Sequence, residues 1–210
     1  MFQGNDTSAL AVAHACLFLA MYPDIQEKVY TEIIEYFPSE EAEINAESLK
    51  LLVYTDMFTK ELLRHCPVAP TIARTCMRDI ELDGVTIPAG NVFIFSFWAL
   101  HRRKDVWGPD ADKFDPDNFL PERCHARNPN AYMPFSTGPR NCIGARYAMI
   151  SLKVMIIHIL RNFKLRTEIR HEDIRFKFGM TLRIETEHLI QVEKRQKIEI
   201  VTPNEQTREI

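Results

Sequence analysis

The chain has 210 residues, of which 46% are hydrophobic and 26% charged, and its formal net charge is −3. This composition is ordinary for a soluble protein with a hydrophobic core. The near-neutral balance of charge gives no indication of nucleic-acid binding. The five cysteines have no paired or C-x-x-C spacing, which argues against a disulfide scaffold and a zinc site and fits a reducing, cytosol-facing environment.

A first helix is predicted over residues 1–21, and its later part is apolar on every side, which indicates a buried helix. The apolar run over residues 9–21 is too short to cross a bilayer comfortably. Asp6 precedes this run without any Lys or Arg, and such a flank argues against a signal peptide. Asp6 and Thr7 follow Gly4, and one interpretation of these residues is simple capping of a helix.

Two amphipathic helices are predicted next. Pro23 begins the second helix, which covers residues 24–37, and the third covers residues 46–65 after an acidic loop. Near the end of the third helix, Glu61 and Arg64 lie on one face and can form an ion pair. Taken alone, this spacing is usually that of a surface pair with little effect on stability.

Short β-prone segments follow. They are predicted at residues 71–77, 80–82, 85–87 and 92–98. Asp83 and Gly84 indicate a hairpin between the second and the third segment, and the continuous apolar run of the fourth indicates a buried strand. The basic residues 101–104 then predict a solvated turn.

The segment over residues 107–130 is rich in Pro, Asp and Asn and has little periodicity, so it is predicted to be an unusually long loop. A helix is predicted over residues 143–160. Short strands are predicted at residues 163–167, 174–185 and 188–192, and the polar residues 193–210 are predicted to be a frayed tail.

The sequence before the last predicted helix reads Phe-Ser-Thr-Gly-Pro-Arg-Asn-Cys-Ile-Gly over residues 135–144. Gly138 and the prolines around it exclude a regular helix or a central strand. Cys142 is therefore expected in a loop at the N-terminus of a helix, where unpaired N–H groups and the helix dipole favour a thiolate. A thiolate is the form that binds a metal, whereas the alternative interpretation is an ordinary buried cysteine.

This stretch matches the pattern F-x-x-G-x-R-x-C-x-G, the haem-thiolate signature of the cytochrome P450 superfamily, at every fixed position. The chain therefore resembles a P450. The resemblance implies that Cys142 is the axial ligand of the iron in haem b and that Arg140 pairs with a haem propionate. It also implies that Phe135 belongs to the haem-binding set and that Gly138 and Gly144 let the backbone approach the porphyrin.

Other motifs follow in the order found in the carboxyl-terminal half of a P450, and they are most similar to family 4, particularly its arthropod members. By this resemblance Asp6 and Thr7 are the catalytic acid–alcohol pair that relays protons. Glu61 and Arg64 are the structural pair that supports the segment around the cysteine. Asn118 stands where an arginine often completes a triad with them, so the triad is expected to be weaker.

The resemblance also assigns residues around the cofactor and the substrate. Arg74 is a second propionate-binding residue, with an exposed strand arginine as an equal alternative. The expected substrate pocket contains Ala69, Pro70, Thr71, Met180 and Thr181. Gln3 stands where many family-4 enzymes have a glutamate that esterifies a haem methyl, so the haem is expected to be non-covalent.

The implied fold is mainly α with small β-sheets (α+β). Residues 1–192 are expected to form the C-terminal half of a P450 domain, truncated at the central distal helix, and residues 193–210 a polar tail. P450 chains are about twice this length, so the isolated chain is expected to be inactive. It is expected to touch a membrane only through an N-terminal anchor that it lacks.

The implied function is that of a monooxygenase that inserts one atom of O2 into an apolar substrate such as a fatty acid, a hormone or a xenobiotic. NADPH–cytochrome P450 reductase would supply the electrons at the cytosolic face of the endoplasmic reticulum membrane, and residues 101–104 are an alternative contact for it. Two other interpretations remain: a non-catalytic, truncated haem-binding remnant, and a P450-fold isomerase. An isomerase needs no proton relay, so the Asp6–Thr7 pair argues against it.

Overall fold

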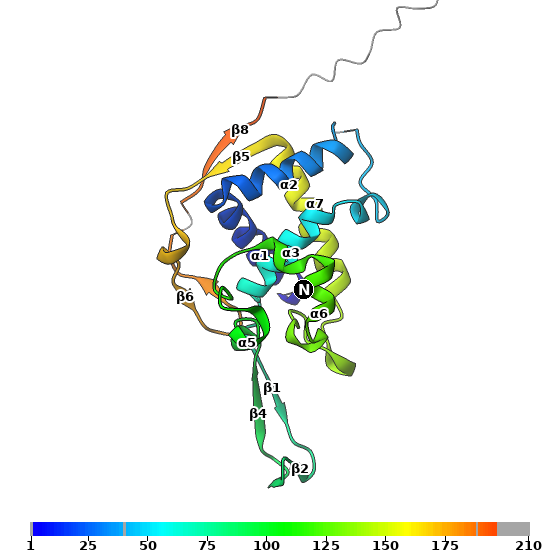
Figure 1. The fold of residues 1–210 in the computed structure, drawn as a ribbon, viewed down its shortest axis with the longest axis vertical. Helices are drawn as coiled ribbons and strands as arrows, with labels where there is room; N and C mark the ends of the chain where they lie inside the picture. The colour runs from blue at the N-terminus through cyan, green and yellow to red at the C-terminus, as the bar shows by residue number, and fades with distance from the viewer. Residues whose placement is uncertain (1, 40, 188, 197–210) are drawn as a thin grey trace, which may run out of the picture.

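The computed structural model describes residues 2–39, 41–187 and 189–196. Four long helices form the body, namely α1 (Phe2–Met21), α2 (Pro23–Tyr36), α3 (Val53–His65) and α7 (Ala145–Asn162). They pack around a shared hydrophobic core, and two-stranded antiparallel sheets flank this body or project from it (Figure 1). The described residues thus form the expected mixture of helices and small sheets.

The second half of α1 forms the centre of the core. Leu17 and Phe18 have no exposed surface, and neither have Ile33 on α2 and Ile157 on α7. The prediction of a buried helix is confirmed for this part of α1, whereas residues 4–6 in its first turns are exposed. Core packing therefore holds one end of α1 and leaves the other end to border a cavity.

A sharp bend separates α1 from α2. Pro23 lies at the start of α2, where its missing N–H removes no helical hydrogen bond, and the two helices diverge by 112°. Within the described residues, no single helix is long and apolar enough to cross a membrane, and α1 and α2 pass that test only as a bent pair.

Helix α3 is shorter than the helix predicted over residues 46–65. Ser48–Lys50 form a separate short turn, η1. The Asn45 side chain accepts hydrogen bonds from two backbone N–H groups at the start of this turn. An asparagine that caps a turn in this way competes with a continuous helix, so α3 begins only at Val53.

The start of α3 is capped from another helix. The Glu32 carboxylate on α2 accepts the N–H groups of Tyr54 and Thr55 at 2.7 and 2.8 Å, and the Thr55 hydroxyl at 2.6 Å. A carboxylate at this position satisfies unpaired donors and complements the helix dipole. Helix α2 thereby fixes the position at which α3 starts.

Replacement of Glu32 by alanine should lower the free energy of unfolding by about 1–2 kcal/mol, because α3 loses the acceptor at its N-terminus. The matched control is Glu35→Ala, since Glu35 is exposed on the same helix. Urea unfolding followed by circular dichroism measures both variants. Equal losses in the two variants would contradict the capping role.

Two hairpins form an arm that projects from the helical body (Figure 1). In this arm β1 (Thr71–Thr75) pairs with β4 (Val92–Ser96), and β2 (Ile80–Leu82) pairs with β3 (Val85–Ile87), both antiparallel. The predicted hairpin turn at Asp83 and Gly84 is confirmed. Both residues have a positive φ, 50° and 78°, as a tight hairpin turn requires.

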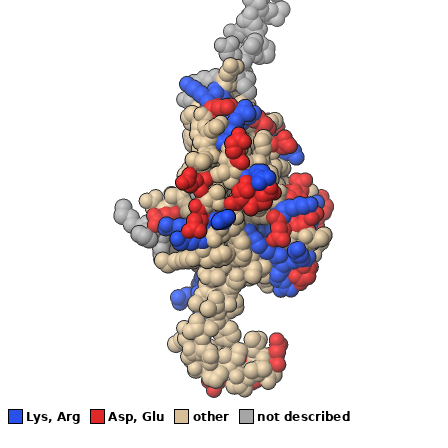
Figure 2. Space-filling model, turned by 90° about the vertical axis from the view of Figure 1, so that its left-hand side faces the viewer, with Lys and Arg blue, Asp and Glu red and all other residues tan. Residues whose placement is uncertain are grey.

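The prediction of a buried strand over residues 92–98 is wrong. Strand β4 ends at Ser96, whose hydroxyl accepts the Ala99 N–H and starts the short helix α4 (Phe97–Leu100). Ile94 on the strand is 74% exposed, because a two-stranded arm has no second layer to cover its apolar side chains. Figure 2 shows the arm as a mostly uncharged projection below a body of mixed charge.

The predicted loop over residues 107–130 contains short helical segments. They are η2 (Pro116–Phe119), α6 (Pro121–Ala126) and η3 (Pro129–Ala131), and the short helix α5 (Lys104–Trp107) ends where the predicted loop begins. The three segments inside the loop, η2, α6 and η3, all begin with proline, whose fixed φ suits the first helical position. The solvated turn predicted over residues 101–104 is wrong at His101, which has no exposed surface.

The last part of the chain forms two further sheets. β5 (Phe163–Arg166) pairs with β8 (Gln191–Lys194), and β6 (Phe176–Lys177) pairs with β7 (Arg183–Ile184), with the short turn η5 (His171–Asp173) between β5 and β6. The prediction of a frayed tail is wrong at its first residues, because Glu193 and Lys194 pair with β5. Arg195 is also held, 2.9 Å from Glu27. The remaining tail residues, 197–210, lie outside the described residues.

Candidate functional site

A cavity of about 500 Å³ lies between the first turns of α1, the end of α3, strand β1 and the segment that leads into α7. Its size is typical of small-molecule sites. Most of the residues that line it are apolar or small, and its walls carry the thiol of Cys142 and the guanidinium groups of Arg74 and Arg140.

Residues 135–144 form the Cys142 loop, a turn closed by its own backbone. The N–H of Cys142 donates to the Phe135 carbonyl at 2.9 Å, and the N–H of Asn141 donates to the Gly138 carbonyl at 3.1 Å. Gly138 has a φ of 77°, a conformation that favours glycine. This glycine is therefore required by the turn itself.

The predicted position of Cys142 in a loop at the start of a helix is confirmed, although the residue lies in the turn that precedes the first helical residue. Helix α7 begins at Ala145 with Gly144 as its N-cap, and the Cys142 carbonyl accepts the Ala145 N–H at 3.3 Å in the turn before the helix. Cys142 is exposed and lines the cavity, so the alternative of an ordinary buried cysteine is wrong. A Cβ added at Gly144 would lie 3.8 Å from Cys142 Sγ, so this glycine leaves the space beside the sulfur open.

One face of α1 forms another wall of the cavity. The lining residues on this face are Gly4, Thr7, Ser8 and Ala11, which have the i, i+3, i+4, i+7 spacing of a helical stripe. Asp6 is exposed and is absent from the described lining residues. The structure thus brings Thr7, but not Asp6, to the cavity that contains Cys142. Both residues lie inside α1, which begins at Phe2, so the capping interpretation is wrong.

The two predicted propionate ligands, Arg74 and Arg140, line the same cavity. Arg74 is exposed, and its Nη2 donates to the Arg140 carbonyl at 3.4 Å. Ile72, two residues earlier on β1, also lines the cavity. Side chains two apart on a strand share one face, and this alternation is the signal by which Ile72 could have been predicted beside Arg74.

The predicted substrate pocket is brought together only in part. Ala69 lines the cavity, whereas Pro70 is buried outside the described lining and Thr71 is exposed on β1. Met180 is 85% exposed, and it and Thr181 are likewise absent from the described lining. The sequence did not point to Leu63 or Phe97, which do line the cavity.

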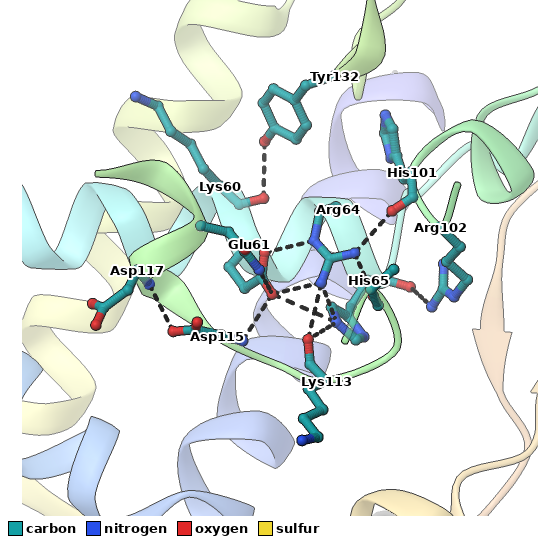
Figure 3. A network of polar contacts seen from close by, with 12 residues as sticks. Lys60, Glu61, Arg64, His65, His101, Arg102, Lys113, Asp115, Asp117 and Tyr132 are labelled. Carbon is teal, nitrogen blue, oxygen red and sulfur yellow. Dashed lines mark hydrogen bonds and ion pairs between the residues drawn. The ribbon is translucent and has the colours of Figure 1, made fainter. Parts of the chain in front are cut away.

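Glu61 and Arg64 form a buried, two-pronged ion pair at the end of α3 (Figure 3). Arg64 Nε and Nη2 each donate to a Glu61 carboxylate oxygen at 2.7 Å, and both side chains have no exposed surface. Arg64 also donates to the backbone carbonyls of His101, Ala111 and Lys113 at 2.8, 2.7 and 3.0 Å. The interpretation as a surface pair is therefore wrong, because the pair is buried and holds two segments of the irregular region, one at His101 and one at Ala111 and Lys113.

Asn118 contacts this ion pair as the triad pattern predicted, and its Nδ2 donates to Glu61 Oε1 at 3.2 Å. Two arginines near α6 reach Asn118. Arg123 Nη1 donates to Asn118 Oδ1 at 3.4 Å and to Asp115 Oδ2 at 3.1 Å. Arg127 donates to the Asn118 carbonyl at 3.0 Å. Positive charge is therefore present beside the asparagine, although at positions that the motif does not mark.

Burial keeps histidines beside the ion pair neutral. It lowers the pKa of His65 well below its usual value, and the positive charges of Arg64 and Arg102 act in the same direction. Burial, followed by the same two charges, lowers the pKa of His101 to about 4. The native protein therefore binds fewer protons at these sites than the unfolded chain does.

The free energy of unfolding should fall by about 2–3 kcal/mol between pH 7 and pH 5.5, because His65 and His101 become protonated in the unfolded chain but not in the native one. Stability is thus lost as pH falls below the unfolded pKa. Urea titrations at the two pH values measure this loss. His101→Gln should remove about half of it, whereas the control His125→Gln, at an exposed position on α6, should leave it unchanged. The same stability at both pH values would contradict the prediction.

Comparison with known proteins places this geometry in a family. The family model for cytochrome P450 matches residues 1–192. The chain belongs to the cytochrome P450 family. Among curated P450s it is similar to probable cytochrome P450 313a4 of Drosophila melanogaster, with 36% identity over 197 residues that cover 93% of this chain and 40% of that protein. Cytochrome P450 4c21 of Blattella germanica is 39% identical over 180 residues, which cover 86% of this chain and 36% of the relative.

The expected similarity to arthropod P450s of family 4 is confirmed by such relatives, and members named 313a match at comparable identity. Probable cytochrome P450 313a1 of Drosophila melanogaster, for example, is 43% identical over 183 residues, which cover 86% of this chain and 37% of the relative. The chain thus spans about two fifths of the length of the curated P450s that it matches.

The chemistry of the cavity suits the haem that P450 membership implies. Cys142 offers a sulfur ligand for iron, and Arg74 and Arg140 offer guanidinium groups for two carboxylates. Within the described residues, no group of three or more His, Cys, Asp or Glu side chains is placed to hold a metal ion. A single thiol is enough for iron in a porphyrin, because the ring supplies the in-plane ligands.

Proposed function

We propose that this chain is the haem-binding, carboxyl-terminal half of a P450 monooxygenase that inserts one atom of O2 into an apolar substrate. One observation carries the proposal: Thr7 on α1, Arg74 on β1, and Arg140 and Cys142 in the Cys142 loop come from three separate segments of the chain and line one cavity. Family membership supports the reaction class. The proposal includes a domain over residues 1–192, electrons from NADPH–cytochrome P450 reductase, and a location at the endoplasmic reticulum membrane.

In this proposal the cavity residues hold haem b by three kinds of contact. Cys142 Sγ would bind the iron, Arg74 and Arg140 would bind the propionates, and Phe135 would pack beside the ring. Bound haem supplies the oxidative chemistry with O2, and thiolate donation to its iron favours O–O cleavage. The haem is held without a covalent bond to the chain, because a glutamine at position 3 cannot form the ester that a glutamate can.

The chain's own contribution to proton transfer is assigned to α1. The Asp6 carboxylate is exposed, whereas the neighbouring Thr7 lines the cavity. Adjacent helical residues point in different directions around the axis, so in this proposal Asp6 exchanges protons with water and Thr7 relays them on the cavity side of the helix. A placed proton donor typically contributes about 10²–10⁴-fold to a rate.

The substrate is proposed to be apolar because the cavity residues other than the arginines and the cysteine include several apolar side chains. Val68, Ala69, Ile72 and Phe97 line the cavity near the base of the arm. Such walls favour an apolar ligand, because burial of its apolar surface away from water lowers the free energy. Fatty acids, hormones and xenobiotics share this chemistry, and the remainder of a full-length P450 would complete the specificity.

The cavity is also open to solvent. Ile143 and Tyr147 line it but are 104% and 67% exposed. Water reaches the cavity by this route, so we propose that the 210-residue chain does not turn over substrate unless further polypeptide covers these side chains.

The test of the proposed function is the absorption spectrum of the reduced, carbon-monoxide-bound haem in a chain that carries this segment at the length of its curated relatives. Cys142→Ser should abolish the strongly red-shifted Soret band, because a serine oxygen does not replace thiolate donation. Cys124→Ser is the matched control, since Cys124 is also exposed but lies on α6 outside the described lining.

The band should be retained in Cys124→Ser, and the 210-residue chain measured alongside should lack it. An unchanged band in Cys142→Ser would overturn the assignment of the iron ligand. A strong red-shifted band from the 210-residue chain would overturn the inference that its open cavity prevents haem enclosure.

A further inference from the structure

His101 occupies a buried position between the ion pair and the Cys142 loop. It follows α4 and has no exposed surface. Its ring lies between aromatic neighbours, with centroid distances of 6.4 Å to Phe97 and 5.4 Å to Tyr132. Figure 3 shows the carbonyl oxygen of His101 directed at Arg64 and the ring directed away from it.

The backbone and the ring of His101 make different hydrogen bonds. The backbone carbonyl accepts a hydrogen bond from Arg64 Nη1 at 2.8 Å. On the other side, the ring nitrogen Nε2 accepts the backbone N–H of Met133 at 3.0 Å. A backbone N–H can only donate, so Nε2 carries no proton and the ring proton is on Nδ1. Within the described part of the chain, this Nδ1 is buried without a hydrogen-bond partner.

Met133 leads directly into the Cys142 loop. The Ser136 N–H donates to the Met133 carbonyl at 3.1 Å, and the Cys142 N–H donates to the Phe135 carbonyl at 2.9 Å. His101 therefore lies between two anchored groups, the Arg64 guanidinium on one side and the start of the loop on the other.

We propose that His101 is a positioning residue that transmits the fixed geometry of the Glu61–Arg64 ion pair to the Cys142 loop through the Met133 N–H. The iron-binding role of the loop rests on the proposed function. The positioning role of His101 rests only on the hydrogen bonds described above. Three properties of the side chain are needed together: the reach to Met133, an acceptor atom at that distance, and a flat apolar body that fits between Phe97 and Tyr132.

The surroundings of His101 also keep it in the acceptor form. Arg64 and Arg102 are positive groups close enough to oppose protonation of its ring, and burial acts in the same direction. A protonated ring has no free lone pair on Nε2, so it would both lose the Met133 bond and add a positive charge beside two others. At neutral pH the acceptor is therefore retained.

The test compares two substitutions that introduce the same amide group at different reach. In His101→Gln the amide oxygen can take the place of Nε2, whereas in His101→Asn the shorter side chain places it near the position of Nδ1. The control is Tyr132→Phe, which removes the bond from the Tyr132 hydroxyl to the Lys60 carbonyl in the same cluster and leaves the Met133 bond in place.

The readout is amide hydrogen exchange of the 210-residue chain at the N–H groups of Met133, Ser136 and Cys142, with the amides of α2 as an internal reference. His101→Asn should accelerate exchange at these three amides by about tenfold relative to the reference, as expected for loss of one buried hydrogen bond. His101→Gln should stay within about threefold of the unmodified chain, and Tyr132→Phe should leave the three amides unchanged.

Equal exchange in the Asn and Gln variants would overturn the proposal. So would an acceleration that is spread evenly over α2 and the loop, because it would show a loss of general stability. The measurement requires no haem. A negative result in the exchange experiment therefore rejects the positioning role alone. An unchanged carbon monoxide spectrum in Cys142→Ser would instead reject the proposed function alone.

Discussion

Glu61 and Arg64 carry opposite charges in a place where neither side chain has exposed surface. The cost of removing both charges from water must be offset by close pairing and by hydrogen bonds to the remaining donors and acceptors. Arg64 meets this condition with two bonds to the carboxylate and three to backbone carbonyls. The segments that supply those carbonyls, over residues 101–113, have little regular structure of their own. They take one arrangement because the guanidinium group must be satisfied, and this requirement organises the region that leads to the Cys142 loop.

Helix α3 connects this ion pair to the cavity through four consecutive residues. Glu61 and Arg64 form the pair, Leu62 is buried in the core, and Leu63 lines the cavity. Successive helical residues point about 100° apart, so one turn of α3 places side chains in the ion pair, in the hydrophobic core and at the cavity. The Glu32 carboxylate fixes where α3 begins, and the core packing of α1 fixes the helix that carries Thr7. The site is therefore assembled from rigid helices on one side and from a loop held by hydrogen bonds on the other.

Much of the site was predictable because its chemistry depends on local spacing. The Cys142 loop and the Glu61–Arg64 pair each follow from residues that are near one another in sequence, whereas the contact of Asn118 with Glu61, which are 57 residues apart, was predicted only by the family resemblance. What was not predictable depends on contacts between distant segments. The basic sequence around His101 predicted a solvent-exposed turn. However, the His101 carbonyl accepts a hydrogen bond from the buried Arg64, and aromatic rings cover the His101 side chain. The apolar β4 indicated burial, yet no second layer covers the arm. Arg123 and Arg127 reach Asn118 only through the turn of α6.

The central claim is that the buried ion pair holds the Cys142 loop in place. The most direct measurement compares Glu61→Gln with Glu47→Gln by urea unfolding and by amide exchange at Cys142. Glu47 pairs with Lys50 at 2.7 Å, but their side chains are 81% and 67% exposed. Glu61→Gln should lower the free energy of unfolding by about 3–5 kcal/mol, because it leaves a buried guanidinium without its counter-charge, and it should accelerate exchange at Cys142. Glu47→Gln should change neither quantity. Similar behaviour of the two variants, or a loss of stability that leaves exchange at Cys142 unchanged relative to α2, would contradict the claim.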